Sequence, residues 1–359
     1  MSVASFDHPA LETRVVDSLV APSIAARNEM LSAPITTRNH AQFYSDTACL
    51  HEVELSQPEV VSAEFAHPTT VAFWNVERLK DIPNVVRLLK EASADIALLS
   101  EVDVGMARTG QRNTIREAAQ SFGGGYAFGV EYVELGLGDD KERATFAGQT
   151  NSAGLHGAAI ISRARIRRPA LMRRDCAGAW FGPEFGERRV GGRIAIAAQA
   201  RVRDQEVTFV SVHLESHSDP DDRAESTRRL LTLIDEYSRD TPVVIGGDFN
   251  TSTASRQERE DRGRWREALR VDPERTLRPE AFEPLFRYFG AAGFEWASAN
   301  VPRASTERPD PKNRDDMPLG KIDWFFTRGI SVSGARVIPA VASNGKVIAD
   351  HDMLLMTIP

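Results

Sequence analysis

Eight side chains suited to metal binding or proton transfer stand beside short apolar runs of this sequence. They are Asn75, Glu101, His213, Asp248, Asn250, Asp323, Asp350 and His351. Asn75 ends the run Val-Ala-Phe-Trp, and Glu101 follows Ile-Ala-Leu-Leu-Ser. Carboxylates bind hard cations, and imidazoles exchange protons near neutral pH. The set therefore indicates a chemical site, provided that the fold brings its members together.

Each of these residues also has an ordinary structural explanation. Asn75, Asp248 and Asn250 suit turns, and Gly246-Gly247 before Asp248 strengthens that explanation. His213 in an apolar run is more often a hydrogen-bonded core histidine. Taken together, however, buried charges without partners would cost several kcal/mol each. A divalent cation shared by the group removes that cost, which favours a common site.

The elements that position these residues alternate between strands and helices. Apolar runs predict strands at residues 71–76, 96–99, 126–133, 158–162, 193–202, 207–214, 243–245, 322–327, 332–337 and 353–358. Helical spacing appears at residues 82–92, 114–122 and 223–237. This order predicts an α/β layered fold with mixed sheets. Sites in such folds lie at the carboxyl ends of strands, which is where these polar residues fall.

Two regions differ from this pattern. Residues 1–68 show no persistent period, and we expect an extension that either packs on the main body or stays loose. Residues 69–359 then form the catalytic domain. Residues 252–317 are rich in charge and proline, with short helical candidates at 263–270 and 279–289, and are expected to form an elaborated insertion. Both ends of this insertion should approach the site, because it connects Asn250 to Asp323.

Composition excludes several classes of protein. The chain has 359 residues, of which 42% are hydrophobic, and a net charge of −7, so it is globular and has no general attraction for nucleic acid or anionic membranes. It lacks an apolar stretch of about 20 residues for a membrane span. The two cysteines, Cys49 and Cys176, are too few for a disulfide framework. With no secretory signal pattern at the N-terminus, a cytoplasmic location is expected.

Arginine is concentrated in one segment. The sequence has 38 Arg but only 6 Lys, and the segment from Arg163 to Arg193 carries 9 Arg against three acidic residues. Arginine pairs well with phosphate. Arg188, Arg189 and Arg193 are therefore candidate substrate-binding residues, with Arg108 a weaker one; a solvated loop is the alternative.

The ordered set of motifs resembles the endonuclease/exonuclease/phosphatase superfamily of DNase I-like, metal-dependent phosphoesterases. The resemblance covers the chain from about residue 70 to the C-terminus. It rests on Trp74-Asn75, Ser100-Glu101-Val102-Asp103, the segment 157–162, Val212-His213-Leu214, Gly246-Gly247-Asp248-Phe249-Asn250, Lys321-Ile322-Asp323 and Ala349-Asp350-His351. The resemblance implies a four-layer αββα sandwich that hydrolyses a phosphate ester with Mg²⁺ or Mn²⁺.

The resemblance also implies a role for each residue. Glu101 would be the principal metal ligand, with Asn75 and Asp350 as companions. Asp248 would activate the attacking water, and Asn250 would position it. Asp323 would orient His351, which with His213 would contact the scissile phosphate. In relatives that carry this second histidine an acid supports it, and Glu131 or Glu134 are the two candidates here.

A Mg²⁺-dependent phosphodiesterase or phosphatase acting on a small or lipid-like substrate is the leading functional hypothesis. An endo- or exonuclease is the alternative, favoured by the arginine cluster and opposed by the net charge. A non-catalytic binding module on the same fold ranks lower, because all eight site positions are intact.

Overall fold

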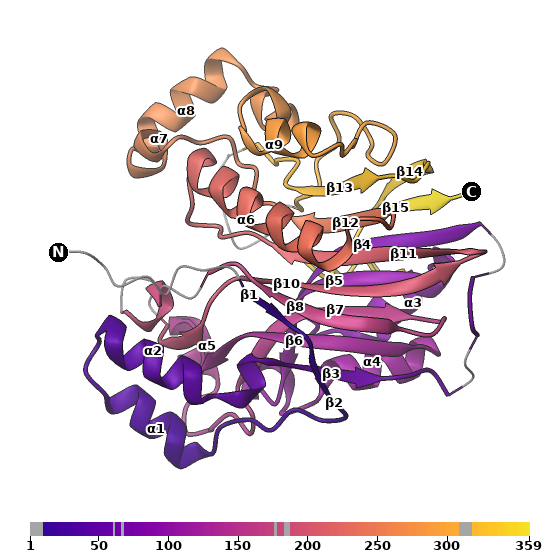
Figure 1. Cartoon of the computed structure of the whole chain (residues 1–359). Coiled ribbons are helices and arrows are strands. Elements are labelled where there is room, and N and C mark those ends of the chain that lie inside the picture. The colour runs from indigo at the N-terminus through magenta and orange to yellow at the C-terminus, as the bar shows by residue number, and fades with distance from the viewer. Residues whose placement is uncertain (1–9, 60–61, 66–67, 176–177, 183–186, 309–317) are drawn as a thin grey trace.

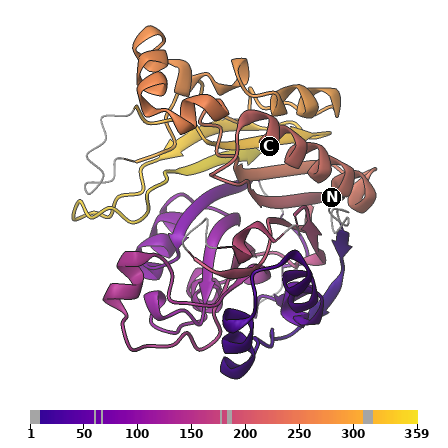
Figure 2. The same cartoon turned by 90° about the vertical axis from the view of Figure 1, so that its left-hand side faces the viewer.

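The computed structural model describes residues 10–59, 62–65, 68–175, 178–182, 187–308 and 318–359. Within them, two β-sheets pack face to face, and helices cover the outer face of each sheet (Figures 1 and 2). This arrangement confirms the predicted α/β four-layer αββα sandwich. Cys49 is buried with a free thiol, and Cys176 lies outside the described residues.

The smaller sheet has six strands, in the order β1-β8-β10-β11-β12-β13. Their bounds are Ala10–Glu12, Arg167–Arg173, Ile194–Val202, Gln205–His213, Val243–Asp248 and Asp323–Arg328. The β11–β12 pair is parallel, and the other pairs are antiparallel. A mixed sheet was expected from the combination of helical crossovers and hairpins.

The larger sheet has nine strands, in the order β14-β15-β4-β5-β7-β6-β3-β2, with β9 beside β6. Their bounds in that order are Ser333–Ile338, Met353–Ile358, Thr69–Arg78, Ile96–Val104, Leu155–Ser162, Gly125–Glu134, Glu52–Ser56, Arg14–Val16 and Arg189–Gly191. Each of the strands predicted from apolar runs falls on an observed strand.

Helices connect and cover the sheets. The α-helices are α1 Ile24–Ser32, α2 Thr37–Asp46, α3 Ile82–Glu91, α4 Thr114–Phe122, α5 Asp140–Thr145, α6 Pro220–Ser238, α7 Arg256–Glu260, α8 Arg262–Val271 and α9 Leu285–Ala291. Short 3-10 turns lie at Ala48–Leu50, Ala107–Thr109, Ala179–Phe181, Arg275–Leu277 and Pro279–Ala281. Asp81, the N-cap of α3, accepts a hydrogen bond from the backbone N–H of Asn84 and so begins this helix.

Three apolar layers hold the sandwich together. Side chains alternate along β4, so that Phe73 packs between the sheets while Trp74 packs under α3 and α4. A third layer joins the smaller sheet to α6 through Val210, Ile245 and Leu230. The strands are buried on both faces, which is why they read as continuous apolar runs in the sequence.

The N-terminal segment is built into both sheets. Strand β1 pairs with β8 at the edge of the smaller sheet, whereas β3 pairs with β6 in the larger one. Of the two expectations for residues 1–68, the described part therefore fits packing on the main body. Strands β1 and β2 have three residues each, too few for a periodic pattern to predict them.

The insertion between residues 252 and 317 carries helices α7 to α9. The helix expected at 279–289 is interrupted, because Pro284 at the N-cap of α9 separates this helix from the turn at Pro279–Ala281. Helix α9 packs beside α6, and the Phe289 ring stacks on Phe326 of β13 with centroids 3.7 Å apart. The insertion thus extends the outer layer over the smaller sheet.

Candidate active site

The candidate site residues meet where the strands of both sheets end. In the smaller sheet, the register places His213 of β11 beside Asp248 of β12, and Asp248 beside Asp323 of β13. In the larger sheet, Asn75 of β4 pairs with Ser100, next to Glu101 of β5. The carboxyl ends of β4, β5, β11 and β12 therefore form one edge, as the sequence predicted.

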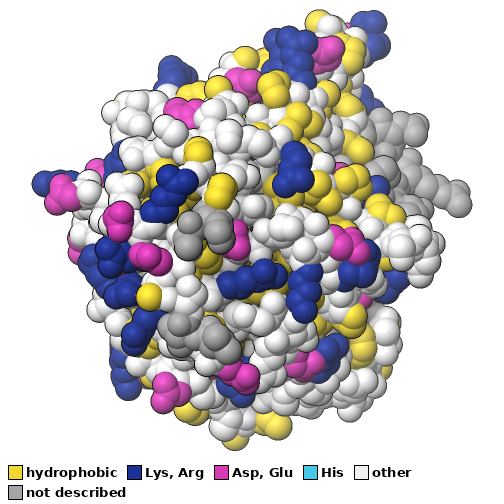
Figure 3. All heavy atoms as spheres, turned by 90° about the vertical axis from the view of Figure 1, so that its right-hand side faces the viewer, with side chains coloured by type: hydrophobic (Ala, Val, Ile, Leu, Met, Phe, Trp, Pro, Cys, Tyr) yellow, Lys and Arg dark blue, Asp and Glu magenta, His cyan; other side chains and the backbone are white. Residues whose placement is uncertain are grey.

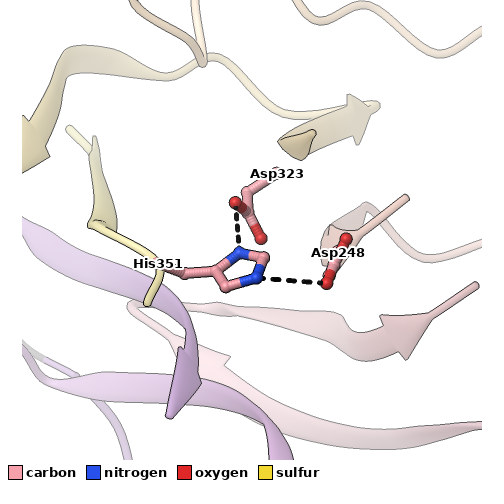
Figure 4. A group of neighbouring side chains, drawn as sticks. All are labelled: Asp248, Asp323 and His351. Atoms are coloured by element: carbon pink, nitrogen blue, oxygen red, sulfur yellow. Dashed lines mark hydrogen bonds and ion pairs between the residues drawn. The ribbon is translucent and has the colours of Figure 1, made fainter. Parts of the chain in front are cut away.

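His351 lies between two aspartates (Figure 4). Its Nδ1 is 2.9 Å from Asp323 Oδ2, and its Nε2 is 3.8 Å from Asp248 Oδ2. The backbone oxygen of His351 accepts a hydrogen bond from the Trp74 indole, 2.8 Å away, which fixes the loop before β15. Burial opposes protonation, but the charges of Asp323 and Asp248 outweigh it and hold the pKa of His351 well above its ordinary value.

Asn75 joins the two sheets at this edge. Its amide Nδ2 lies 3.2 Å from Glu101 Oε1 in the larger sheet and 3.1 Å from Asp248 Oδ2 in the smaller one. Its side-chain oxygen accepts from the backbone N–H of Glu77. The buried Asn75 thus sets the spacing between the two carboxylates.

Asp248 is buried among several polar groups of the site. Burial and the neighbouring charge of Asp323 raise the pKa of Asp248 to about 7, against the opposite effect of His351. The other carboxyl oxygen, Oδ1, accepts from the backbone N–H of Asn250 at 2.9 Å. Asn250 in turn donates its amide to the backbone oxygen of Leu214. A buried carboxyl whose pKa lies near 7 suits proton transfer at neutral pH.

Glu101 projects from an irregular point of β5. It has a left-handed backbone (φ 56°), and the register with β7 shifts between Leu99 and Val102. Such bulges re-aim side chains next to active sites. Desolvation opposes its charge, but Arg78 and the neighbouring His213, His156 and His351 hold the pKa of Glu101 well below its ordinary value. Arg78, which the sequence did not single out, donates to Glu101 Oε2.

His213 lies on the other side of Asp248. Its Nε2 is 3.4 Å from Asp248 Oδ2, and its buried Nδ1 has no hydrogen-bond partner among the described residues. Burial, together with the charge of Arg193, holds the pKa of His213 well below its ordinary value. Of the two acids expected to support His213, Glu131 pairs with Arg193 and Glu134 with Arg189, each at 3.1 Å.

The candidate substrate-binding arginines all have protein partners. Arg193 lies between Glu131 and Glu215, 3.1 Å from each, and its guanidinium covers the ring of Trp180. Arg188 donates to backbone oxygens of α1 and the residue after it, at Leu31 and Ala33. Arg189 covers the Tyr132 ring. Their contact with substrate remains a prediction, and the charges of Arg189 and Arg193 are already neutralised by acids.

A second buried network lies behind Glu101 and was missed in the sequence. Asp103 Oδ1 is 2.7 Å from His156 Nδ1, and Asp103 Oδ2 accepts from Arg108 Nε at 2.7 Å. The His156 ring stacks on Tyr132 at 4.7 Å. The signal was present in the alternation of Glu101 and Asp103 along one strand. Arg108, the weaker substrate candidate, is bound within this network.

The oxygen donors at this edge fit a hard divalent cation. Glu101 and Asp350 supply carboxylate oxygens, the ligands that Mg²⁺ and Mn²⁺ prefer. Asn75 turns its amide Nδ2 to Glu101 and its oxygen to the backbone N–H of Glu77, so its role as a metal ligand remains a prediction. Asp350 is exposed as a residue, but desolvation raises the pKa of its carboxyl; His351 opposes this rise, and the like charges of Glu101 and Glu77 add to it. Asp248, Asp323 and His351 also place ligand atoms within 4.8 Å of one another. Because His351 Nδ1 already bonds Asp323, we regard those three as a proton-handling group.

Comparison with known proteins shows the family and the fold of this chain. The model of the endonuclease/exonuclease/phosphatase family matches residues 72–351, and the chain belongs to that family. Its fold is similar to that of an endonuclease/exonuclease/phosphatase from Beutenbergia cavernae (15% identity, 81% of this chain and 71% of that chain, TM-score 0.55). It is also similar to the human Nocturnin catalytic domain, solved with bound sulfate (13% identity, 85% and 96%, TM-score 0.51). No curated protein matches the sequence.

Proposed function

We propose that this protein is a metal-dependent phosphoester hydrolase whose substrate is a small or lipid-like phosphodiester or phosphomonoester. The observation that carries the proposal is the row His213, Asp248 and Asp323 across three adjacent strands, with His351 over it and Glu101 opposite. Membership of the family supports phosphoester hydrolysis. Of the described helices, none is long and apolar enough to cross a membrane.

Asp248 is the proposed base for the attacking water. Its raised pKa gives it both charged and protonated forms near neutral pH, and Asn250 positions the water beside it. His351, protonated beside Asp323, stabilises the negative charge that grows on a phosphate oxygen. His213, kept neutral by burial, contacts another oxygen as a hydrogen-bond donor.

Glu101, with Asn75 and Asp350, is the proposed ligand set for Mg²⁺ or Mn²⁺. When bound, such a cation supplies Lewis-acid stabilisation of the phosphate charge. In this structure Arg78 donates a hydrogen bond to Glu101. The charge of Arg78 keeps the Glu101 carboxylate ionised, as the charge of a bound cation would.

The charge distribution supports a small substrate over a long nucleic acid. Arg189 and Arg193 are each paired with glutamates. On the face at the other end of the sheets, drawn in Figure 3, basic and acidic side chains are intermixed as well. A nuclease would instead follow several phosphates with positive charges free to pair. Nuclease activity is the second candidate, and the arginine-rich segment beside the site is what favours it.

A hydrolysis screen tests the proposal. Model diesters and monoesters, choline- and glycerol-phosphodiesters, nucleotides and plasmid DNA are each incubated with Mg²⁺, with Mn²⁺ and with excess EDTA. We expect a small ester to be hydrolysed with higher kcat/KM than DNA, with loss of activity in EDTA and in Asp248→Asn. Asp240→Asn, an exposed aspartate after α6, is the matched control. Turnover that persists in EDTA would contradict metal dependence, and plasmid nicking without small-ester activity would favour the nuclease.

A further inference from the structure

The last two residues of β4 and the residue that follows form a turn with an unusual backbone. Glu77, Arg78 and Leu79 are consecutive non-glycine residues with left-handed φ angles of 43°, 67° and 55°. Residues with a Cβ are strained there, and runs of such residues persist only where the surroundings enforce them. The turn closes through a bond from the backbone N–H of Leu79 to the oxygen of Val76. A tight turn of this kind is ordinarily the place for glycine, so the arginine side chain itself requires an explanation.

The backbone of this turn directs Arg78 at Glu101. The register of β4 with β5 shifts between Asn75 and Arg78, and Arg78 pairs with Val102 after the shift. From this position, the guanidinium donates through Nη1 to Glu101 Oε2, while Asn75 occupies Oε1. A cation that binds Glu101 must therefore share or take the oxygen that Arg78 contacts.

The guanidinium has hydrogen-bonding capacity left over. Its Nε is buried and lacks a hydrogen-bond partner in the described part of the chain. The side chain is 24% exposed and that of Glu101 18%, so the ion pair is accessible from the site. By contrast, Arg108 and Arg193 are committed to buried acids. Among the residues that the structure describes, the partner of Arg78 is thus Glu101, a proposed metal ligand.

We propose that Arg78 binds the substrate phosphate, and that it does so by exchanging Glu101 for a phosphate oxygen when a divalent cation takes Glu101. The inference rests on the proposed function and deepens it. Arg78 and the cation are alternative partners for Glu101 in the free protein, but they act together on a bound phosphate. Arginine suits this exchange, because its fork of donors fits carboxylate and phosphate oxygens equally well.

The exchange predicts opposite effects of one substitution on two ligands. Arg78→Gly removes the side chain at a φ angle that glycine adopts freely, so the fold should be retained. Without its competitor, Mn²⁺ should bind at least threefold more tightly, as measured by electron paramagnetic resonance of free Mn²⁺. Inorganic phosphate, titrated calorimetrically in saturating Mg²⁺, should bind at least tenfold more weakly. Arg78→Lys keeps the positive charge but lacks the paired donors of the guanidinium. Its affinities for Mn²⁺ and for inorganic phosphate should each lie between those of Arg78→Gly and the wild type.

A second left-handed arginine provides the matched control. Arg203, φ 54°, lies exposed in the turn between β10 and β11, and Arg203→Gly should change neither affinity. Weaker or unchanged Mn²⁺ binding in Arg78→Gly would overturn the competition, and unchanged phosphate binding would overturn the phosphate role. Neither readout requires turnover. If the wild type hydrolyses no ester, the proposed function fails while the exchange at Arg78 is still decided.

Discussion

Replacing Asp248 by asparagine should stabilise the folded protein at neutral pH when divalent cations are absent. Asp248 is 2% exposed, and it faces Asp323 across the β12–β13 pair. These two features raise its pKa to about 7 from an ordinary value of 3.8. An ionised Asp248 is therefore a source of instability above pH 7, which an uncharged amide of the same shape removes.

The magnitude follows from proton linkage. A carboxyl whose pKa is raised by folding binds more protons in the folded state, so the free energy of unfolding falls as pH rises from about 4 to about 7. At about 1.4 kcal/mol per pH unit, the loss approaches about 4 kcal/mol. In the wild type, Asn75 Nδ2 and the Asn250 N–H each donate to a different oxygen of Asp248. Asparagine has only one side-chain oxygen, so one of these hydrogen bonds is lost, which lowers the free energy of unfolding by about 1–2 kcal/mol. The net gain for Asp248→Asn is about 2–3 kcal/mol at pH 8, with a loss at pH 4.

Urea denaturation in EDTA at pH 4, 6 and 8 measures this difference without any substrate. Asp240→Asn, at an exposed position, controls for the change in net charge. A difference between Asp248→Asn and the wild type that is the same at all three pH values would refute the reasoning, because only a titrating group produces a pH-dependent gain. Added Mg²⁺ should narrow the difference, since the charge of a cation at the neighbouring Glu101 would favour the ionised form of Asp248, which the variant lacks.

Three further outcomes are expected. Glu101→Ala should weaken Mn²⁺ binding at least tenfold in a titration followed by electron paramagnetic resonance, and an unchanged affinity would remove Glu101 from the ligand set. Asp323→Asn should lower kcat about 10- to 100-fold, as expected for losing a buried charge-assisted bond worth about 1.5–3 kcal/mol to His351. Combined with His351→Gln it should add little, whereas additive losses would contradict the pairing. Arg223→Met should lower the free energy of unfolding by about 3–5 kcal/mol in urea, because it leaves Glu283 charged and fully buried, and a loss below about 1 kcal/mol would show the pair to be dispensable.

The strands and the site edge were predictable because one property of the sequence encodes both. A strand buried on two faces requires a continuous apolar run, and the first polar residue after the run marks its end. Asn75, His213 and Asp248 were identified in this way, and the register brings the latter two side by side. The short strands β1 and β2 could not be found, since three residues carry no period.

The partners of the arginines were beyond the reach of the sequence. Arg193 and Glu131 are 62 positions apart, and Arg188 bonds the backbone of a helix more than 150 positions earlier. Arginines that lie close together in the sequence were therefore predicted to be available for binding phosphate. In the folded chain, however, Arg189 and Arg193 form ion pairs with glutamates. Arg78, which does face the site, lies outside that cluster. Its direction depends on a left-handed turn that no residue type in Glu-Arg-Leu signals.

The candidate site lies where the edges of the two sheets meet, and each sheet contributes residues with a different proposed role. The proton-handling group, Asp248, Asp323 and His351, depends on the smaller sheet and the loop before β15, whereas Glu101 and Arg78 belong to the larger sheet. Asn75 is the hydrogen-bonded link between the Glu101 and Asp248 carboxylates. A change in the packing of the sheets would therefore alter the distance between Glu101, the proposed metal ligand, and Asp248, the proposed base. If these residues act as proposed, the layer of apolar side chains between the sheets supports catalysis by holding that distance, in addition to stabilising the fold.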